Sequence, residues 1–120
     1  MRGLVLVGLL LVRSAAAAAG EADVVAAEAF PESGERWRFS VTVAHDDSGW
    51  EHYADRWEVV APDGTVLGTR VLAHPHESEQ PFTRSLGGVA VPPEIDRVTI
   101  RAYDSMHGGG GRELTVTLPR

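Results

Sequence analysis

The chain has 120 residues, no cysteine and a formal net charge of −6. The lack of cysteine excludes disulfides, thiolate metal ligands and cysteine nucleophiles. The acidic balance argues against nucleic acid and anionic membrane surfaces as partners, because both repel a negatively charged protein.

The N-terminal segment, residues 1–19, has the pattern of a secretory signal peptide. Met1-Arg2 give it a positive start, residues 4–12 form an apolar run, and residues 15–19 are alanines suited to a cleavage site. The apolar run is about half as long as the roughly 20 residues that span a bilayer, which argues against a retained anchor. We predict cleavage near the end of the alanine run and localisation in the periplasm or outside the cell.

The mature domain predicted at residues 20–120 is long enough to form one hydrophobic core. Loss of the two leader arginines leaves nine arginines against seventeen acids, a net charge of −8. We expect no membrane insertion once the leader is removed, and no cysteine is present to accept a lipid.

Apolar and polar residues alternate along most of the mature chain, as in strands with one buried face. The alternation is clearest at residues 37–43 (WRFSVTV), and further strands are predicted at residues 23–30, 53–60, 65–72, 82–86, 95–103 and 112–118. Between two of them, Ala61-Pro62-Asp63-Gly64 predicts a hairpin with a type I turn and a bulge. The pattern indicates an all-β fold, an immunoglobulin-like or fibronectin-III-like sandwich of about seven antiparallel strands. A small barrel is the alternative.

Three of the predicted loops carry the five histidines of the chain, which are His45, His52, His74, His76 and His107. If each strand reverses direction, the loops after the second, fourth and sixth strands meet at one end of the sandwich. The loops at a sandwich end are where such folds carry binding sites. Because neutral imidazole suits copper, zinc and nickel, the sequence predicts a metal-binding end.

We predict a copper or zinc ion as cofactor. Its ligands are imidazoles that can reach a common point, and nearby carboxylates bind the ion or orient the imidazoles. The predicted residues are His52, His74, His76, His107, Glu77 and Glu79. Pro75 favours an extended backbone, so the rings of His74 and His76 are expected to project to opposite sides and one ion would take only one of them. Met106, beside His107, has a soft thioether that would suit Cu(I).

A different class of function remains open, in which the histidines are structural or solvated and the loops contact a protein partner of the cell envelope. The segment Asp46-Asp47-Ser48-Gly49 lacks the spacing of an EF-hand and is interpreted as a turn. No nucleophile elbow or phosphate-binding loop is present in the sequence, so we predict a protein that is not an enzyme.

Two strings resemble a group of small exported bacterial proteins of unassigned function. They are residues 49–59 (GWEHYADRWEV), which lead into Pro62-Asp63-Gly64, and residues 74–86 (HPHESEQPFTRSL). The likeness continues through residues 97–108, and it implies export and a small β domain without implying an activity. More loosely, the chain is similar to periplasmic copper carriers with an immunoglobulin-like fold. It departs from them because it has no methionine-rich run and no histidine at the expected mature N-terminus.

Overall fold

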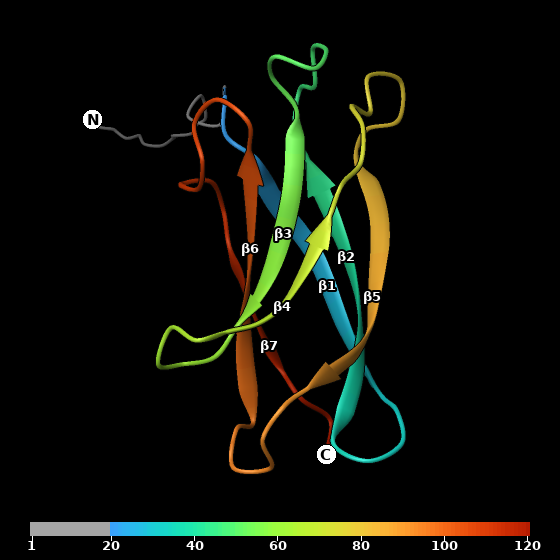
Figure 1. The fold of residues 1–120 in the computed structure, drawn as a ribbon, viewed down its shortest axis with the longest axis vertical. Helices are drawn as coiled ribbons and strands as arrows, with labels where there is room; N and C mark the ends of the chain where they lie inside the picture. Colours follow the sequence, from blue (N-terminus) through green and yellow to red (C-terminus); the bar gives the residue numbers. More distant parts are fainter. Residues whose placement is uncertain (1–19) are drawn as a thin grey trace, which may run out of the picture.

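The computed structural model describes residues 20–120, which form two β-sheets packed face to face (Figure 1). The leader expected at residues 1–19 lies outside the described residues. The strands in chain order are β1 (Asp23–Pro31), β2 (Arg36–Ala44), β3 (Ala54–Val60), β4 (Val66–Val71), β5 (Phe82–Ala90), β6 (Arg97–Asp104) and β7 (Leu114–Thr117).

One sheet has the order β1-β2-β5 and the other β4-β3-β6-β7, and every paired neighbour is antiparallel. The predicted all-β sandwich of seven antiparallel strands is therefore confirmed, and the alternative of a closed barrel is not adopted. The fourth strand pairs with the third strand. Of the two arrangements expected, immunoglobulin-like and fibronectin-III-like, this pairing is the fibronectin-III-like one. Within residues 20–120, no helix is long and apolar enough to cross a bilayer.

Strand β5 is longer than predicted, because the glycine pair after Leu86 does not end it. Gly88 has φ +68° and lies in a bulge where two residues of β5 face one residue of β2. The side chain of Glu32 accepts a hydrogen bond from the Gly88 amide at 2.8 Å. The pair therefore bends the strand and lets it continue to Ala90.

The core is built from the inward-facing residues of both sheets. In β2, Trp37, Phe39, Val41 and Val43 are buried in strict alternation, as their spacing predicts. Trp57 of β3 is fully buried opposite them. Full burial of one large apolar side chain contributes roughly 1.5–3 kcal/mol, so these layers supply the main driving force for folding.

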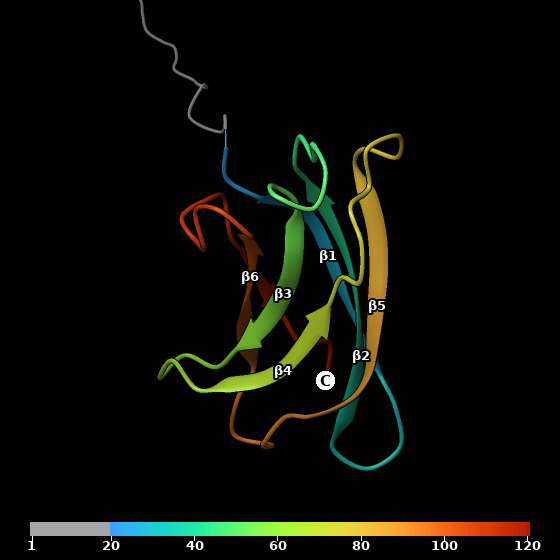
Figure 2. The ribbon, with the colours of Figure 1, turned by 45° about the horizontal axis from the view of Figure 1, so that its top comes forward.

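The loops fall at the expected ends of the sandwich. The predicted hairpin turn joins β3 to β4, with Gly64 at φ +93° and its amide donating to the Ala61 carbonyl at 2.9 Å. At the opposite end lie the β2–β3, β4–β5 and β6–β7 loops, together with the start of the described chain at Gly20 (Figures 1 and 2). This loop end holds all five histidines, as predicted.

Candidate metal centre

At the loop end, polar residues occupy the positions that continue the buried faces of β2 and β6. His45 and Asp47 follow Val43 in the inward phase of β2, and Asp104 follows Ala102 at the end of β6. All three are buried, with exposed fractions of 7%, 7% and 2%. Because ionisable groups are costly to bury without partners, such residues must be paired or bind an ion.

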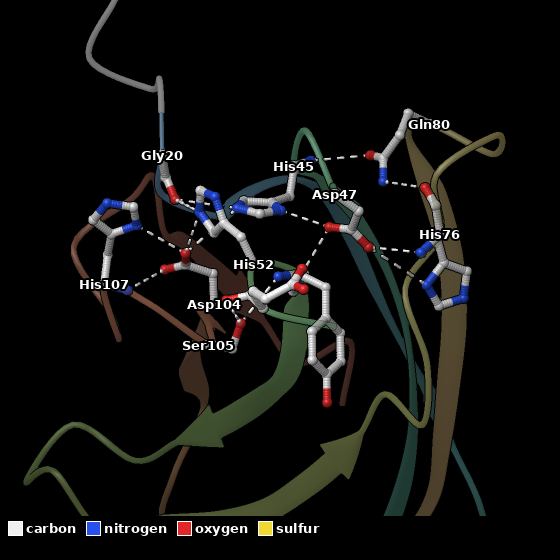
Figure 3. Close-up of polar contacts among 12 residues, drawn as sticks. Gly20, His45, Asp47, His52, His76, Gln80, Asp104, Ser105 and His107 are labelled. Atoms are coloured by element: carbon white, nitrogen blue, oxygen red, sulfur yellow. Dashed lines mark hydrogen bonds and ion pairs between the residues drawn. The ribbon is translucent and has the colours of Figure 1, made fainter. Parts of the chain in front are cut away.

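Asp47 is the acceptor that holds the loops together. Its Oδ1 accepts the amide of Ala54 at 3.0 Å and lies 2.5 Å from Nδ1 of His45, and its Oδ2 accepts the amide of His76 at 2.7 Å (Figure 3). Gln80 adds a second link, accepting from the His45 amide and donating to the His76 carbonyl. The imidazole of His45 is thereby fixed in position by its own loop and by the β4–β5 loop.

Asp104 is the second buried carboxylate, and three imidazoles converge on its Oδ2 atom. His52 Nε2 lies at 2.8 Å, His107 Nδ1 at 2.8 Å and His45 Nε2 at 3.5 Å from this oxygen. The rings of His52 and His107 have centroids 5.0 Å apart, and those of His45 and His52 are 4.8 Å apart. This convergence, drawn in Figure 3, is the densest polar cluster of the loop end.

The charge state of this cluster follows from the hydrogen bonds of His107. Burial acts to raise the pKa of Asp104, but the side-chain and backbone hydrogen bonds from His107 outweigh it and hold that pKa below its usual value. The same side-chain hydrogen bond raises the pKa of His107. Asp104 is therefore an ionised carboxylate at neutral pH, available to a cation.

The main-chain carbonyl of Gly20 completes the cluster. Its oxygen lies 3.1 Å from His45 Nε2 and 3.0 Å from His52 Nε2. Each of these two nitrogens therefore faces two oxygens, the Gly20 carbonyl and the Asp104 carboxylate.

The contacts of His45 can be satisfied in two ways, by a bound cation or by a second proton on the ring. Asp47 can only accept, so Nδ1 of His45 must carry a proton to satisfy it. In the neutral ring this leaves a lone pair on Nε2, which faces the oxygens of Gly20 and Asp104. Lone pairs directed at one another are repulsive unless a cation lies between them or the ring carries a second proton.

The separations suit one small ion. One ligand atom from each of His45, His52 and Asp104 lies within 4.8 Å of the other two. Zinc with bonds of about 2.0–2.1 Å in tetrahedral geometry places its ligands about 3.4 Å apart. The distances of 2.8 Å and 3.5 Å from Asp104 Oδ2 to the two imidazoles bracket that value.

The predicted ligands are distributed over two places. His52 belongs to the converging group, and His107 contacts Asp104 beside it. His76 lies on the other side of Asp47 (Figure 3), where its ring stacks on Phe82 at a centroid distance of 4.1 Å, and the His74 ring lies next to that of His76. The expectation that the His74 and His76 rings project to opposite sides is wrong, because the chain bends at His74 and the rings lie 4.7 Å apart.

The remaining predicted residues lie at the solvent-exposed edge of the β4–β5 loop. Glu79 forms an ion pair with Arg84 at 3.0 Å, and the hydrogen bond from Arg84 lowers the pKa of Glu79. Glu77 is exposed. Neither forms a hydrogen bond or ion pair with a histidine within residues 20–120. A ligand role for these two, and for His74 and His76, stays a prediction.

The sequence alone does not single out Asp104. It allows Asp47 as a turn residue or as a carboxylate that orients an imidazole or binds the ion, and it leaves His45 outside the predicted ligand set. The alternation of buried and exposed residues could have identified them, because His45, Asp47 and Asp104 each continue the buried face of a strand. The turn interpreted at Asp46-Asp47-Ser48-Gly49 begins later than expected: Gly49 has φ +107° and accepts a hydrogen bond from the His52 amide at 3.2 Å. Met106 is 64% exposed and is not a core residue.

An open pocket with acidic lining lies beside His45. Its lining includes the acids Glu21, Asp23 and Asp46 together with His45. Carboxylates at the mouth of a site raise the local concentration of positive ions. Some of the acidic side chains that give the chain its negative charge therefore lie next to His45.

Comparisons with known proteins give a relative but no family. The chain is 43% identical over 96 residues to a protein of Halomicrobium mukohataei named "Putative lipoprotein"; the match covers 80% of this chain and 47% of that protein. The chain therefore spans about half the length of that relative. No family model matches the chain, and no solved structure matches it.

Proposed function

We propose that this protein is an exported β-sandwich that binds a transition-metal ion, copper or zinc, through His45, His52 and Asp104. The observation that carries the proposal is the position of His45 Nε2, which faces the oxygens of Gly20 at 3.1 Å and Asp104 at 3.5 Å while Nδ1 of the same ring lies against Asp47. An ion at this point would convert a repulsive contact into coordination. Nothing in this arrangement requires a catalytic step, and we propose binding without catalysis.

The donor set favours particular metals. Two imidazoles and one carboxylate suit zinc and copper, whereas calcium and magnesium prefer oxygen ligands alone. Asp47 supports the site as an outer partner, because a metal-bound imidazole commonly donates its other N–H to a carboxylate. This contact fixes both the tautomer and the orientation of His45.

Export is supported by two independent features. The N-terminal residues have the pattern of a signal peptide, and the relative named a lipoprotein belongs to a class of exported, membrane-anchored proteins. This sequence contains no cysteine, so we do not extend lipid anchoring to it.

A second candidate function is an interaction module whose partner docks on the same loop end. Trp50 and Met106 favour it, since both are large apolar residues and are 65% and 64% exposed there. Aromatic residues and methionine are enriched in protein interfaces. The module would bind its envelope partner whether or not metal is present.

Calorimetric titration of the metal-stripped protein with Zn(II) and Cu(II) tests the first candidate. We expect one equivalent to bind, and we expect H52A to weaken binding by at least about 100-fold, more than the roughly 10- to 100-fold typical for loss of an outer partner. H74A is the matched control, since this histidine lies outside the group, and it should bind like the wild type. Equal losses in H52A and H74A would contradict the assignment.

A further inference from the structure

We propose that the α-amino group of Gly20, released when the leader is cleaved, is a further ligand of the metal centre. The centre would then be complete only in the processed protein. This inference rests on the proposed metal-binding function and on the cleavage boundary predicted from the sequence. It assigns a role to a main-chain group that lies among the histidines.

The position of Gly20 is unusually close to the three imidazoles. Its carbonyl oxygen lies within 3.1 Å of the Nε2 atoms of both His45 and His52. A Cβ atom at this position would lie 2.5 Å from Cε1 and 2.9 Å from Nε2 of His107. A side chain at this position would force the His107 ring or the chain start to move, and the backbone of Gly20 lies close to the rings (Figure 3).

Covalent geometry brings the nitrogen of Gly20 to the same place. Standard bond lengths and angles keep the nitrogen and the carbonyl oxygen of one residue about 2.7–3.6 Å apart, depending on ψ. A free α-amine and its own carbonyl oxygen can bind one metal ion in a five-membered chelate ring. An ion held by His45 and His52 beside this oxygen is therefore within reach of the nitrogen.

Cleavage changes the chemistry of that nitrogen. In the uncleaved chain it belongs to a peptide bond, whose resonance withdraws the lone pair. Once free, it is an amine whose lone pair is available to a metal ion, and binding the ion displaces its proton. The nitrogen of Gly20 is thus both the atom released by the predicted cleavage and an atom next to the histidine cluster. Metal loading would therefore follow export and processing.

The composition of the chain permits a clean test. The mature sequence contains no lysine, so the α-amino group is its sole primary amine and can be acetylated selectively. A chain that starts at Gly20 contains all seven strands and the whole described core, so it is expected to fold by itself. Acetylation keeps the carbonyl oxygen and the register of every residue, and removes only the donor nitrogen.

We would titrate the Gly20-starting protein with Cu(II) and Zn(II) before and after acetylation, and record the Cu(II) electron paramagnetic resonance spectrum of both forms. We expect acetylation to weaken Cu(II) binding by at least about tenfold and to change the spectrum, with unchanged thermal unfolding of the metal-free protein. A protein that retains Ala19 should behave like the acetylated form.

Equal affinity and identical spectra in the free and acetylated forms would overturn the amine ligand while leaving the metal centre intact. Absence of metal binding in both forms would overturn the proposed function, and this inference with it. The two failures are therefore distinguishable in the same experiment.

Discussion

Nδ1 of His45 lies 2.5 Å from Oδ1 of Asp47, and both side chains are buried beneath the loop end. This contact sets which nitrogen of His45 is free, and the free nitrogen points into the cluster around Asp104. The carboxylate of Asp47 contacts one nitrogen of the His45 ring. It thereby decides which atom of this ring is available to a metal ion on the opposite side.

Replacing Asp47 with asparagine should weaken metal binding without removing a ligand. The Asn amide can accept at only one of the two positions. With its nitrogen toward His76, the His76 amide loses its acceptor; with its nitrogen toward His45, the Ala54 amide loses its acceptor and the His45 tautomer is reversed. We expect D47N to lower metal affinity by about 10- to 100-fold and the free energy of unfolding by about 1–3 kcal/mol, measured by calorimetry and urea denaturation. D96N, at an exposed aspartate before β6 at the opposite end of the sandwich, is the control. Equal behaviour of the two variants would contradict the role of Asp47.

Replacing Asp104 with asparagine should lower the pKa of His107. In the wild type, the side-chain hydrogen bond to Asp104 raises this pKa above its ordinary value. Without the negative charge, the pKa of His107 should return toward about 6.5. Proton NMR of the histidine ring in the metal-stripped protein measures it. An unchanged His107 titration in D104N would show that another group is responsible.

The same raised pKa gives a pH dependence of stability. Protonated His107 stabilises the folded state fully below about pH 6.5, and this contribution is lost as the pH rises through the folded-state pKa. H107Q should therefore lower the melting temperature of the metal-stripped protein more at pH 6 than at pH 8.5. An equal loss at both pH values would exclude a stabilising charge on His107.

His76 should show the opposite dependence. Both of its ring nitrogens are buried without a hydrogen-bond partner within the described residues, and burial lowers its pKa, aided by the positive charge of Arg84. A lowered pKa stabilises the folded state above about pH 6.5, and this contribution is lost as the pH falls through the folded-state pKa. We expect H76F, which keeps a ring on Phe82, to remove part of the acid destabilisation and to raise stability. A melting temperature with the wild-type pH slope would contradict this account.

Replacing Gly20 with alanine should weaken metal binding through a steric clash. The added Cβ would lie 2.5 Å from the His107 ring, so the chain start or the ring must move. We expect G20A to lower metal affinity by about tenfold, and to have a smaller effect in an H107A background, where the ring is absent. Coupling of this kind is measured by a double-mutant cycle. Additive effects would show that Gly20 and His107 do not share the site.

The fold could be predicted from the sequence because its information is local. Alternation at residues 37–43 and the turn residues Pro62-Asp63-Gly64 specify a strand and a hairpin directly. Reversal of direction at each loop then places the five histidines at one end. The continuation of β5 beyond Leu86 could not be predicted, because a bulge at Gly88 depends on pairing with β2, which is distant in sequence.

The site could be predicted only in outline. His52 was chosen by its place at the mouth of a strand, whereas His74 and His76 were chosen because they are close in sequence. Convergence on Asp104 depends on how β6 ends against the β2–β3 loop, where Ser105 accepts a hydrogen bond from the Tyr53 amide at 3.0 Å. Such a long-range contact cannot be predicted from the spacing of neighbouring residues. The local sequence shows only that Asp104 continues the buried face of its strand.

Titration of the metal-stripped protein with Zn(II), followed residue by residue through the histidine side-chain NMR signals, tests the central claim most directly. The account predicts that the signals of His45 and His52 change together and saturate at one equivalent, while the signals of His74 do not change. Saturable changes confined to His74 and His76, or no changes in His45 and His52, would contradict a metal centre at His45, His52 and Asp104.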